Sequence, residues 1–300
     1  MLIFLTGATG FIGSAIVPEL LSAGHRVLGM TRSEAGARAL AKAGVEPLLG
    51  NLEDVDSLHR GAAQADGVIH TAFDHDDFSN FVANCEKDRR AIEALGSALK
   101  GSDRPLLITS GVGFGCSAPG MPAREDVFNA EYPNPRVASE LAGVKLLDEG
   151  VNVSVMRLPQ VHDTVEQGLV TYLVELARAK GVSAYVGEGA NRWAAGPVLD
   201  VARLYRLAVE KADAGARYHA VAEEGVSARH IAEVVGRGLK VPVSAISSEE
   251  VAGHFGWLGL FAGHDMSASS VWTQDQLGWR PTGPGLLADL ERMDYSRASS

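Results

Sequence analysis

Apolar and polar residues follow two distinct patterns along the first half of the chain. Short, uninterrupted apolar runs are typical of strands covered on both faces, and apolar residues at every third or fourth position are typical of helices. The predicted strands are residues 2–5, 26–30, 46–49, 67–70, 106–109 and 152–158. The helices predicted between them are residues 11–23, 34–43, 55–63, 77–99 and 136–149. Because strands that alternate with helices form right-handed βαβ units, the pattern predicts an α/β fold with a doubly wound parallel sheet.

The pattern changes after about residue 160. The predicted helices there are residues 164–180, 201–211, 227–239 and 285–293, with little strand between them. Glycine and proline interrupt the segments at 187–189, 196–197 and 281–285. We therefore expect a main domain of residues 1–160 and a smaller, mostly helical C-terminal lobe of residues 161–295. Some segments of the lobe are expected to return to the main sheet.

Composition and charge exclude several classes of protein. The chain has 300 residues, of which 46% are hydrophobic and 21% charged, close to the averages for soluble globular proteins. Its net charge of −10 gives no general attraction to nucleic-acid phosphates or anionic lipid. No apolar run approaches the ~20 residues of a membrane span, and the N-terminus lacks the features of a signal peptide. We expect a cytoplasmic protein without a nucleic-acid or membrane partner.

A glycine-rich turn between the first strand and the first helix is the strongest functional motif. Residues 6–13 read TGATGFIG. Gly7 permits a tight turn, Gly10 lets the backbone approach a diphosphate, and Gly13 allows the helix to pack closely on the strand. The helix that begins near Phe11 directs its free N–H groups at the phosphates. The turn therefore predicts a Rossmann-type domain that binds NAD(P), and a glycine-rich turn without a ligand is the alternative. The predicted diphosphate-binding residues are Gly7, Thr9, Gly10, Phe11, Ile12 and Gly13.

The end of the second predicted strand favours NADP over NAD. A dinucleotide site for NAD usually has an Asp or Glu there, and this chain has no carboxylate before Glu34. Arg32 can instead pair with a 2′-phosphate and stack on adenine. We predict NADP as the cofactor, with NAD as the alternative if Arg32 is only a solvated surface residue.

The turn resembles that of the short-chain dehydrogenase/reductase superfamily, in its extended or atypical type, which includes nucleotide-sugar epimerases and dehydratases. Four further segments keep the same register as the family, namely Gly50-Asn51-Leu52, residues 68–72, Thr109-Ser110-Gly111 and Arg157-Leu158-Pro159. The likeness covers residues 1–210 well and continues more weakly to Asp289. It implies that the strand ends line the dinucleotide. The cofactor residues implied in this way are Asn51, Leu52, Thr71, Ala72, Phe73, Arg136 and Pro159.

The resemblance also implies a catalytic Ser and a Tyr-x-x-x-Lys pair. Ser110 matches the Ser and Tyr132 lies near the place of the Tyr, but Arg136 stands near the place of the Lys. Arg136 supplies a fixed charge that can hold ribose hydroxyls and lower the pKa of Tyr132. Pro133 and Pro135 exclude a regular helix between them. Either Ser110, Tyr132 and Arg136 form a working set, or Tyr132 is a loop residue and Arg136 with Glu140 anchors the helix.

Further candidates for a substrate pocket lie at the predicted strand ends or in the lobe. They are His75, Gly111, His162 and Trp193. Residues 74–77, Asp-His-Asp-Asp, have types that bind metals, but we expect Asp76 or Asp77 to cap the next helix and predict no metal site. Pro197 stands where the family often has His, which argues against a sugar-nucleotide substrate. Residues 254–264 form an apolar stretch that lines a pocket or an interface, or belongs to the core.

The sequence therefore favours an NADP-dependent oxidoreductase that transfers a hydride to or from a small or apolar carbonyl or alcohol. A nucleotide-sugar epimerase or dehydratase is a second interpretation, and a non-catalytic NAD(P)-sensing regulator is a third. In all three, residues 161–295 are the substrate-binding lobe. The family resemblance also suggests a homodimer through the helices at 77–99 and 136–149.

Overall fold

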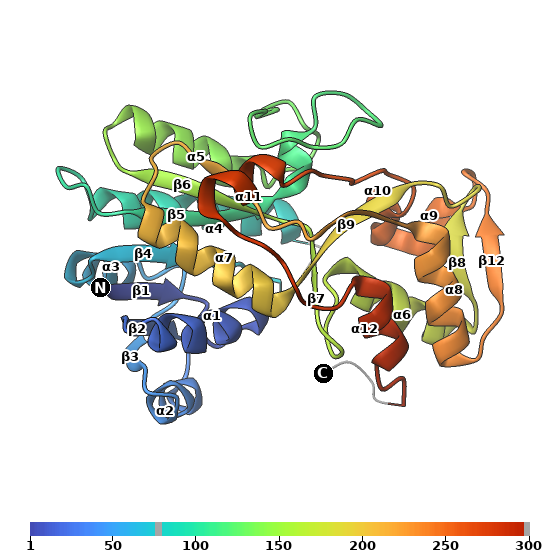
Figure 1. Cartoon of the computed structure of the whole chain (residues 1–300), viewed down its shortest axis with the longest axis horizontal. Helices are drawn as coiled ribbons and strands as arrows, with labels where there is room; N and C mark the ends of the chain where they lie inside the picture. The colour runs from blue at the N-terminus through green and yellow to red at the C-terminus, as the bar shows by residue number, and fades with distance from the viewer. Residues whose placement is uncertain (76–79, 297–300) are drawn as a thin grey trace.

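A seven-stranded parallel sheet forms the centre of the larger part of the molecule in a computed structural model that describes residues 1–75 and 80–296 (Figure 1). Its strands are β1 (Leu2–Thr6), β2 (Arg26–Thr31), β3 (Glu46–Leu49), β4 (Gly67–His70), β5 (Leu106–Gly111), β6 (Val153–Leu158) and β10 (Arg217–His219). They lie in the order β10-β6-β5-β4-β1-β2-β3, and all paired strands run parallel. The predicted doubly wound sheet is confirmed.

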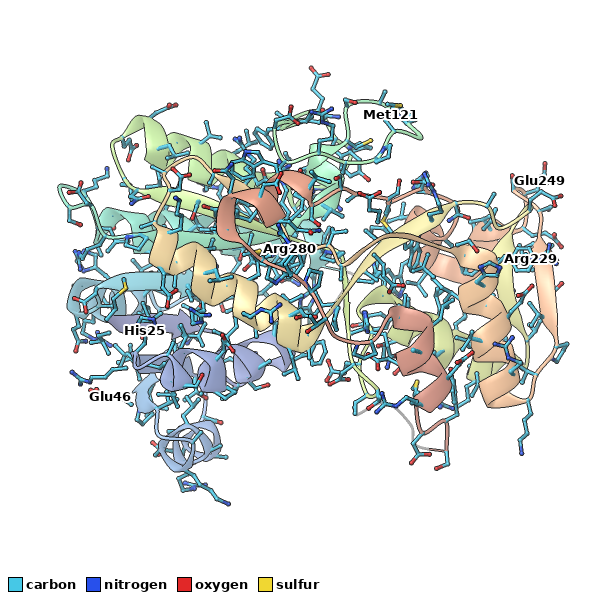
Figure 2. All side chains as sticks on the ribbon, viewed as in Figure 1. His25, Glu46, Met121, Arg229, Glu249 and Arg280 are labelled. Atoms are coloured by element: carbon cyan, nitrogen blue, oxygen red, sulfur yellow. The ribbon has the colours of Figure 1, made fainter. Side chains whose placement is uncertain are left out.

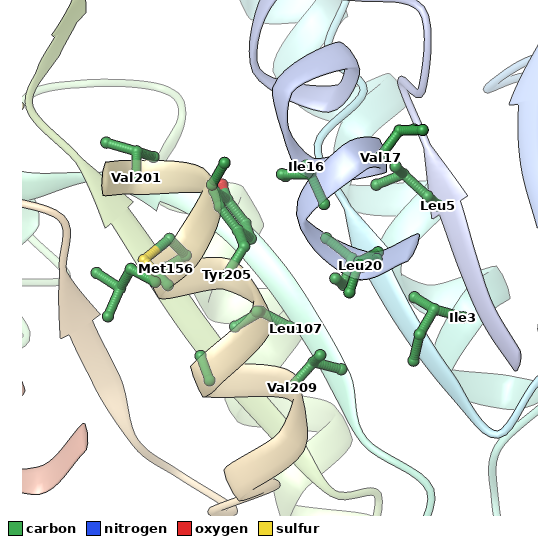
Figure 3. Packing of buried hydrophobic residues seen from close by; sticks show 14 of the residues in the cluster. Ile3, Leu5, Ile16, Val17, Leu20, Leu107, Met156, Val201, Tyr205 and Val209 are labelled. Atoms are coloured by element: carbon green, nitrogen blue, oxygen red, sulfur yellow. The ribbon is translucent and has the colours of Figure 1, made fainter. Parts of the chain in front are cut away.

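Helices cover both faces of this sheet. One face carries α1 (Phe11–Ser22), α2 (Glu34–Lys42) and α7 (Val198–Lys211). The other carries α3 (Val55–Gln64), α4 (Phe81–Ser97) and α5 (Val137–Asp148). Figure 3 shows α1 and α7 facing each other across the first face, with Ile16, Leu20 and Tyr205 pointing inward between them. Central strands such as β1, β4 and β5 are buried and carry mostly apolar residues, which is why the sequence pattern identified them, whereas the edge strand β3 is largely exposed.

The strand order reverses between β1 and β4. From β1 the chain moves outward to β2 and β3, and it then crosses back to β4 and continues in the other direction. The loops that follow β1 and β4 therefore diverge at the carboxyl ends of the strands, where open α/β sheets bind their ligands. The glycine turn lies at this position.

Strands are more numerous after residue 160 than the sequence pattern predicts, so the expectation of little strand there is wrong. Besides β10, they are β7 (Gln160–His162), β8 (Ser183–Val186), β9 (Arg192–Pro197), β11 (Glu223–Ser227) and β12 (Val243–Ile246). Several are short and largely exposed, as in β12, so they lack the continuous apolar run of a central strand. Apart from β10, they form strands because they pair with one another in the folded chain, in the sheets β11-β9-β7 and β12-β8.

The helices of the lobe pack around these strands on one side of the molecule (Figure 1). They are α6 (Leu169–Lys180), α8 (Ala228–Leu239), α9 (Val251–Phe255), α10 (Gly259–Ala262) and α12 (Leu286–Arg292). The helix α6 begins at Leu169 rather than at residue 164, after Gly168 with a φ of +59°. In the stretch 254–264, Phe255, Leu258 and Ala262 are buried against α6 and β8, whereas Trp257 and Leu260 are exposed.

Two segments of the second half return to the main sheet. The strand β10 extends it beside β6, and α7 packs on α1. Trp279, beyond α11 (Val271–Leu277), is fully buried in the same core and donates a hydrogen bond to the carbonyl oxygen of Asp200 at 3.0 Å. These segments connect the two halves of the chain, and the division at residue 160 stays a prediction.

Some expectations concern the surface. Figure 2 shows Met121 projecting from the loop between β5 and α5, away from the sheet. A Lys145–Glu93 ion pair of 2.9 Å joins α5 to α4, and the homodimer through these helices stays a prediction.

The cap expected at Asp76 or Asp77 lies outside the described residues. No helix within residues 1–75 and 80–296 is both long and apolar enough to cross a membrane.

We predict that Gly13→Ala destabilises the protein by at least about 2 kcal/mol. An added Cβ at Gly13 would lie 2.0 Å from the carbonyl oxygen of Gly7, so α1 would have to move off the turn. Gly253→Ala is the matched control, because an added Cβ in α9 would meet no atom within 4 Å. Urea unfolding measures both variants, and equal stabilities would contradict the prediction.

Candidate cofactor and substrate site

The glycine turn is packed against the end of β4. Gly7 has a φ of +71°, and an added Cβ there would lie 2.7 Å from the Thr71 hydroxyl oxygen and 2.8 Å from the Ala72 nitrogen. Gly10 precedes α1 and offers no side chain to its first amides. Those amides therefore need an acceptor from outside the helix, and a phosphate oxygen is of the right kind. Thr9 and Gly10 are exposed, and Phe11 and Ile12 are half-buried.

The residues predicted for the adenosine half lie on the loops after β2 and β3. Arg32 is exposed directly beyond β2, before Ser33 caps α2 by accepting a hydrogen bond from Gly36 N at 3.1 Å. The Asn51 side-chain oxygen accepts from the amides of Glu53 and Asp54, at 2.8 and 3.1 Å. The Asn51 side-chain oxygen therefore stabilises the loop in which Asn51 lies. Leu52 beside it is half-buried.

Arg136 reaches from the start of α5 to the ends of β4 and β5. Its guanidinium carbon lies 3.7 Å from the centre of the Phe73 ring, and its Nη2 donates a 3.4 Å hydrogen bond to the Thr109 carbonyl oxygen. Arg136 Nη1 and the Ser110 hydroxyl oxygen are both buried and have no hydrogen-bond partner among the described residues. Since buried polar groups are normally paired, two such groups at one strand end suit a bound ligand.

Tyr132 lies in the loop before α5, on another side of the same strand end. Its ring packs edge-on against Phe114, with 5.6 Å between ring centres, and lies 3.1 Å from an ideal Cβ position at Gly113. Burial raises the pKa of Tyr132, and the nearby Cys116 raises it further. The expectation that Arg136 lowers this pKa is therefore wrong, because burial dominates and the guanidinium turns toward Phe73.

Glu140 pairs with Arg157 and not with Arg136, which corrects the expectation that Arg136 and Glu140 together anchor the helix. Arg157 Nε and Nη2 donate to the two Glu140 carboxylate oxygens, each at 2.8 Å, and both side chains are fully buried. Two charges this deeply buried are tolerated because the pair is bidentate. Arg157 is the one charged residue in strand β6. A single charge in a buried strand is the sequence signal that could have predicted a buried ion pair.

His219 extends this buried pair to the C-terminal segment. Arg157 Nη1 lies 3.3 Å from His219 Nε2 and 2.8 Å from the Val127 carbonyl oxygen, and His219 Nδ1 lies 2.8 Å from the Ser269 carbonyl oxygen. Burial and the Arg157 charge lower the pKa of His219 to about 3. The neutral ring donates from Nδ1 and accepts at Nε2, so these contacts connect β6, β10 and two loops.

A second buried network runs beneath the glycine turn, and the sequence analysis missed it. Thr6 Oγ1 and His70 Nδ1 are 2.7 Å apart, and His70 Nε2 lies 3.0 Å from Asp88 Oδ1. The Ser139 hydroxyl donates to Asp88 Oδ2 at 2.5 Å. The network joins β1, β4, α4 and α5, close to the start of α5 from which Arg136 reaches the strand ends.

The four residues predicted for the substrate pocket separate into two pairs. His75 and Gly111 lie at the strand ends, where the exposed His75 ring is 4.9 Å from the Phe73 ring. His162 is fully buried, with its Nδ1 2.8 Å from Asp289 Oδ2. Trp193 is buried in the lobe and donates from Nε1 to the His264 carbonyl oxygen at 3.2 Å. Folding thus brings the first pair beside Ser110 and Arg136, and leaves the second pair in the interior of the lobe.

Asp74 in the acidic segment has a lysine partner, and Pro159 lies between two strands. Lys87 donates a 2.6 Å hydrogen bond to Asp74 Oδ2. Pro159 is buried and leads the chain from β6 to β7. Within residues 1–75 and 80–296, His, Cys, Asp and Glu form no group of three or more that is suited to hold a metal ion.

A glycine turn at the reversal point of a doubly wound sheet, with unpaired polar groups at the neighbouring strand ends, defines a dinucleotide-binding enzyme of the extended short-chain dehydrogenase/reductase type. The family model described as "NAD dependent epimerase/dehydratase family" matches residues 3–222. The chain belongs to this family, whose members depend on NAD(P). The resemblance inferred from the sequence is therefore confirmed.

Individual relatives cover most of the chain. An uncharacterized protein of Schizosaccharomyces pombe is 48% identical over 98% of this chain and 100% of its own length. A decarboxylating sterol-4-alpha-carboxylate 3-dehydrogenase of Dictyostelium discoideum is 29% identical over 76% of this chain and 73% of its own length. The crystal structure of a dTDP-glucose 4,6-dehydratase of Streptomyces venezuelae, with NAD bound, has a TM-score of 0.77 at 19% identity and covers 98% of this chain and 96% of that one. This structural likeness shows a shared fold.

We predict that His219 makes the protein less stable in acid. His219 stays neutral in the folded chain down to about pH 3, whereas a histidine in the unfolded chain takes up a proton below about pH 6.5. The unfolded state therefore binds more protons between these values, and the free energy of unfolding falls by about 1.4 kcal/mol per pH unit as the pH drops. Urea unfolding from pH 8 to pH 4 should show a smaller fall for His219→Gln. Equal slopes for the two proteins would contradict the prediction.

Proposed function

We propose that the protein is an NADP-dependent oxidoreductase that transfers a hydride to or from a small or apolar carbonyl or alcohol. The observation that carries this proposal is that Ser110 Oγ and Arg136 Nη1 are two of several buried polar atoms without a hydrogen-bond partner among the described residues, and that Arg136 contacts Thr109 beside Ser110. Ser110 lies at the end of β5, and Arg136 reaches the ends of β4 and β5 from the start of α5. The end of β4 also packs against the glycine turn, and in this proposal the nicotinamide and the substrate oxygen meet there. The family supports an NAD(P)-dependent enzyme, and the hydride transfer and the preference for NADP are our proposal.

In this proposal, different residues of the chain bind different parts of the cofactor. The diphosphate is held by the amides of residues 7–13, and Arg32 pairs with the 2′-phosphate. Asn51 and Leu52 line the adenine side. Thr71, Ala72, Phe73 and Pro159 line the nicotinamide half. When bound, NADP supplies or accepts the hydride, which no side chain can do.

Two groups act on the substrate side of the proposed site. The Ser110 hydroxyl donates a hydrogen bond to the substrate oxygen and stabilises the negative charge that develops on it. Arg136, held over Phe73, contacts the ribose hydroxyls through its free Nη1. Tyr132 is the proposed proton donor, and it has to leave its contact with Phe114 to reach a substrate on Ser110.

The substrate is proposed to be apolar or small because a glycine and an aromatic ring lie at the strand ends near Ser110. Gly111 leaves open space at the end of β5, and Phe73 presents an aromatic ring beside His75. The similar protein of Dictyostelium is named as a dehydrogenase of a sterol carboxylate, which supports a substrate other than a sugar nucleotide.

A second candidate function is nucleotide sensing without turnover. The packing of Tyr132 against Gly113 and Phe114, and its raised pKa, favour it because they leave the site without a ready proton donor. This candidate predicts NADPH binding and no oxidation of NADPH with a broad panel of aldehydes and ketones.

We expect Arg32→Glu to weaken NADPH binding by about tenfold or more and to change NADH binding little. The substitution replaces the partner of the 2′-phosphate by a like charge. Arg38→Glu, which makes the same charge change at an exposed position of α2, is the control and should leave both affinities near their original values. Titration calorimetry with the two reduced cofactors measures the effect. Equal affinities of the unaltered protein for NADPH and NADH would refute the NADP preference.

Ser110→Ala is expected to lower kcat about a hundredfold while the dissociation constant for NADPH stays the same, because a hydrogen bond to the developing oxyanion is lost. Ser154→Ala removes a buried hydroxyl near the other end of the sheet and serves as the control. Tyr132→Phe should lower kcat at least as far. Unchanged turnover in that variant would remove Tyr132 from the mechanism, and unchanged turnover in Ser110→Ala would overturn the proposed chemistry.

A further inference from the structure

Asp88 is a buried carboxylate at the proposed site to which the mechanism above gives no role. It lies on α4 with 1% of its surface exposed, and each of its oxygens has a partner. His70 reaches one oxygen at 3.0 Å and Ser139 reaches the other at 2.5 Å. A carboxylate in such surroundings needs these donors to stay charged, and Ser139 also places it beside the N-terminal turn of α5, where negative charge is favoured.

The position of Ser139 brings Asp88 close to Arg136. Arg136 is the residue that precedes α5, and the amide of Ser139 donates a 3.1 Å hydrogen bond to the Arg136 carbonyl oxygen. Asp88 therefore lies against the same helical turn from which the Arg136 side chain leaves. The Arg136 charge also affects the pKa of Asp88. Burial alone raises the pKa of Asp88, but the charge of Arg136 and the hydrogen bonds from His70 and Ser139 outweigh it and lower this pKa.

Cys85 lies one turn before Asp88 on α4, and both Asp88 and Arg136 affect the pKa of its thiol. Burial raises the pKa of its thiol to about 11, while Arg136 acts to lower it and Asp88 to raise it. The thiol is thus within electrostatic reach of both groups. The cation and the anion share one buried region, although no hydrogen bond joins them.

The other end of the network is the glycine turn. His70 Nε2 lies 3.0 Å from Asp88 Oδ1, and His70 Nδ1 lies 2.7 Å from the Thr6 hydroxyl oxygen. Thr6 Oγ1 in turn accepts from the Ala72 amide at 3.3 Å. Thr6 directly precedes Gly7, so hydrogen bonds connect the predicted diphosphate loop to the helix that carries Arg136.

We infer that Asp88 is a positioning residue of the proposed cofactor site, which holds the Arg136 guanidinium over Phe73 as its counter-ion and ties it, through His70 and Thr6, to the glycine turn. The inference rests on the proposed function. A planar guanidinium presents its N–H groups in fixed directions, so an Arg contacts ribose hydroxyls only when its plane is held. Phe73 stacks on that plane, the Thr109 carbonyl oxygen accepts from one edge, and Asp88 balances the charge.

A double-mutant cycle on NADPH affinity tests whether Asp88 acts through Arg136. Asp88→Asn keeps the shape of the side chain and removes its charge. It is expected to weaken NADPH binding by about tenfold in the unaltered protein and by less than about twofold in an Arg136→Met background. A merely structural role would give the same loss in both backgrounds, which would overturn the inference.

The matched control is Glu140→Gln, which neutralises another buried carboxylate at the start of α5 that has its own partner, Arg157. Its effect on NADPH binding should be the same with and without Arg136. If Asp88→Asn does not fold, Ser139→Ala replaces it in the cycle, because that variant removes one hydrogen bond and leaves the carboxylate in place. The same non-additivity is expected with Ser139→Ala, and an additive result would again contradict the inference.

Failure of the inference and failure of the proposed function give different results. If the unaltered protein binds no NADPH, the proposed function is refuted, and the cycle is then measured on urea unfolding. Non-additive losses of stability for Asp88→Asn and Arg136→Met would still support the pairing of the two charges, and additive losses would overturn it. If NADPH binds and only the unfolding cycle is non-additive, the pairing is structural and the positioning role is refuted.

Discussion

The contact between the glycine turn and its neighbours determines how the rest of the site is built. Helix α1 rests on the turn at Gly13, where any side chain would meet the Gly7 carbonyl oxygen, and the turn rests on the end of β4 at Gly7. Backbone packed on backbone in this way leaves the first amides of α1 at the reversal point of the sheet without a side-chain cap. The direction of those amides, the course of β4 and the position of Phe73 all follow from this packing.

Two buried charge networks surround the strand ends. One joins Arg157, Glu140 and His219 and connects the loop after β5 to the C-terminal segment. The other joins Thr6, His70 and Asp88 beneath the turn. Each contains a carboxylate that has lost its contact with water and is compensated by hydrogen bonds and a nearby cation, so removing one member leaves the others unpaired. Both networks end on α5, at Glu140 and Ser139, so the start of this helix is the place where the two networks come together.

The lobe illustrates how local pattern and folded structure diverge. Strand β12 is mostly exposed and carries no apolar run, and it exists because β8 pairs with it. Trp193 is buried in the lobe core, and Asp289 pairs with His162 Nδ1, while His162 Nε2 is buried without a hydrogen-bond partner among the described residues, so the predicted pocket roles of both residues stay predictions. A polar residue that is paired within the fold and one that faces a ligand have the same sequence signal.

The sequence by itself determined the doubly wound sheet, the glycine turn and the family, because buried parallel strands and a diphosphate turn impose strict local requirements on residue type. It also predicted Ser110 and Arg136 as site residues, through their resemblance to family positions near recognisable strand ends, and these two roles stay predictions. Only the tertiary structure decided which partner each charge takes. Glu140 is one helical turn from Arg136 in the chain but pairs with Arg157, and Asp88 reaches the site from a separate helix. Local periodicity encodes which face of an element is buried, whereas the pairing of charges depends on how elements distant in the chain are brought together during folding.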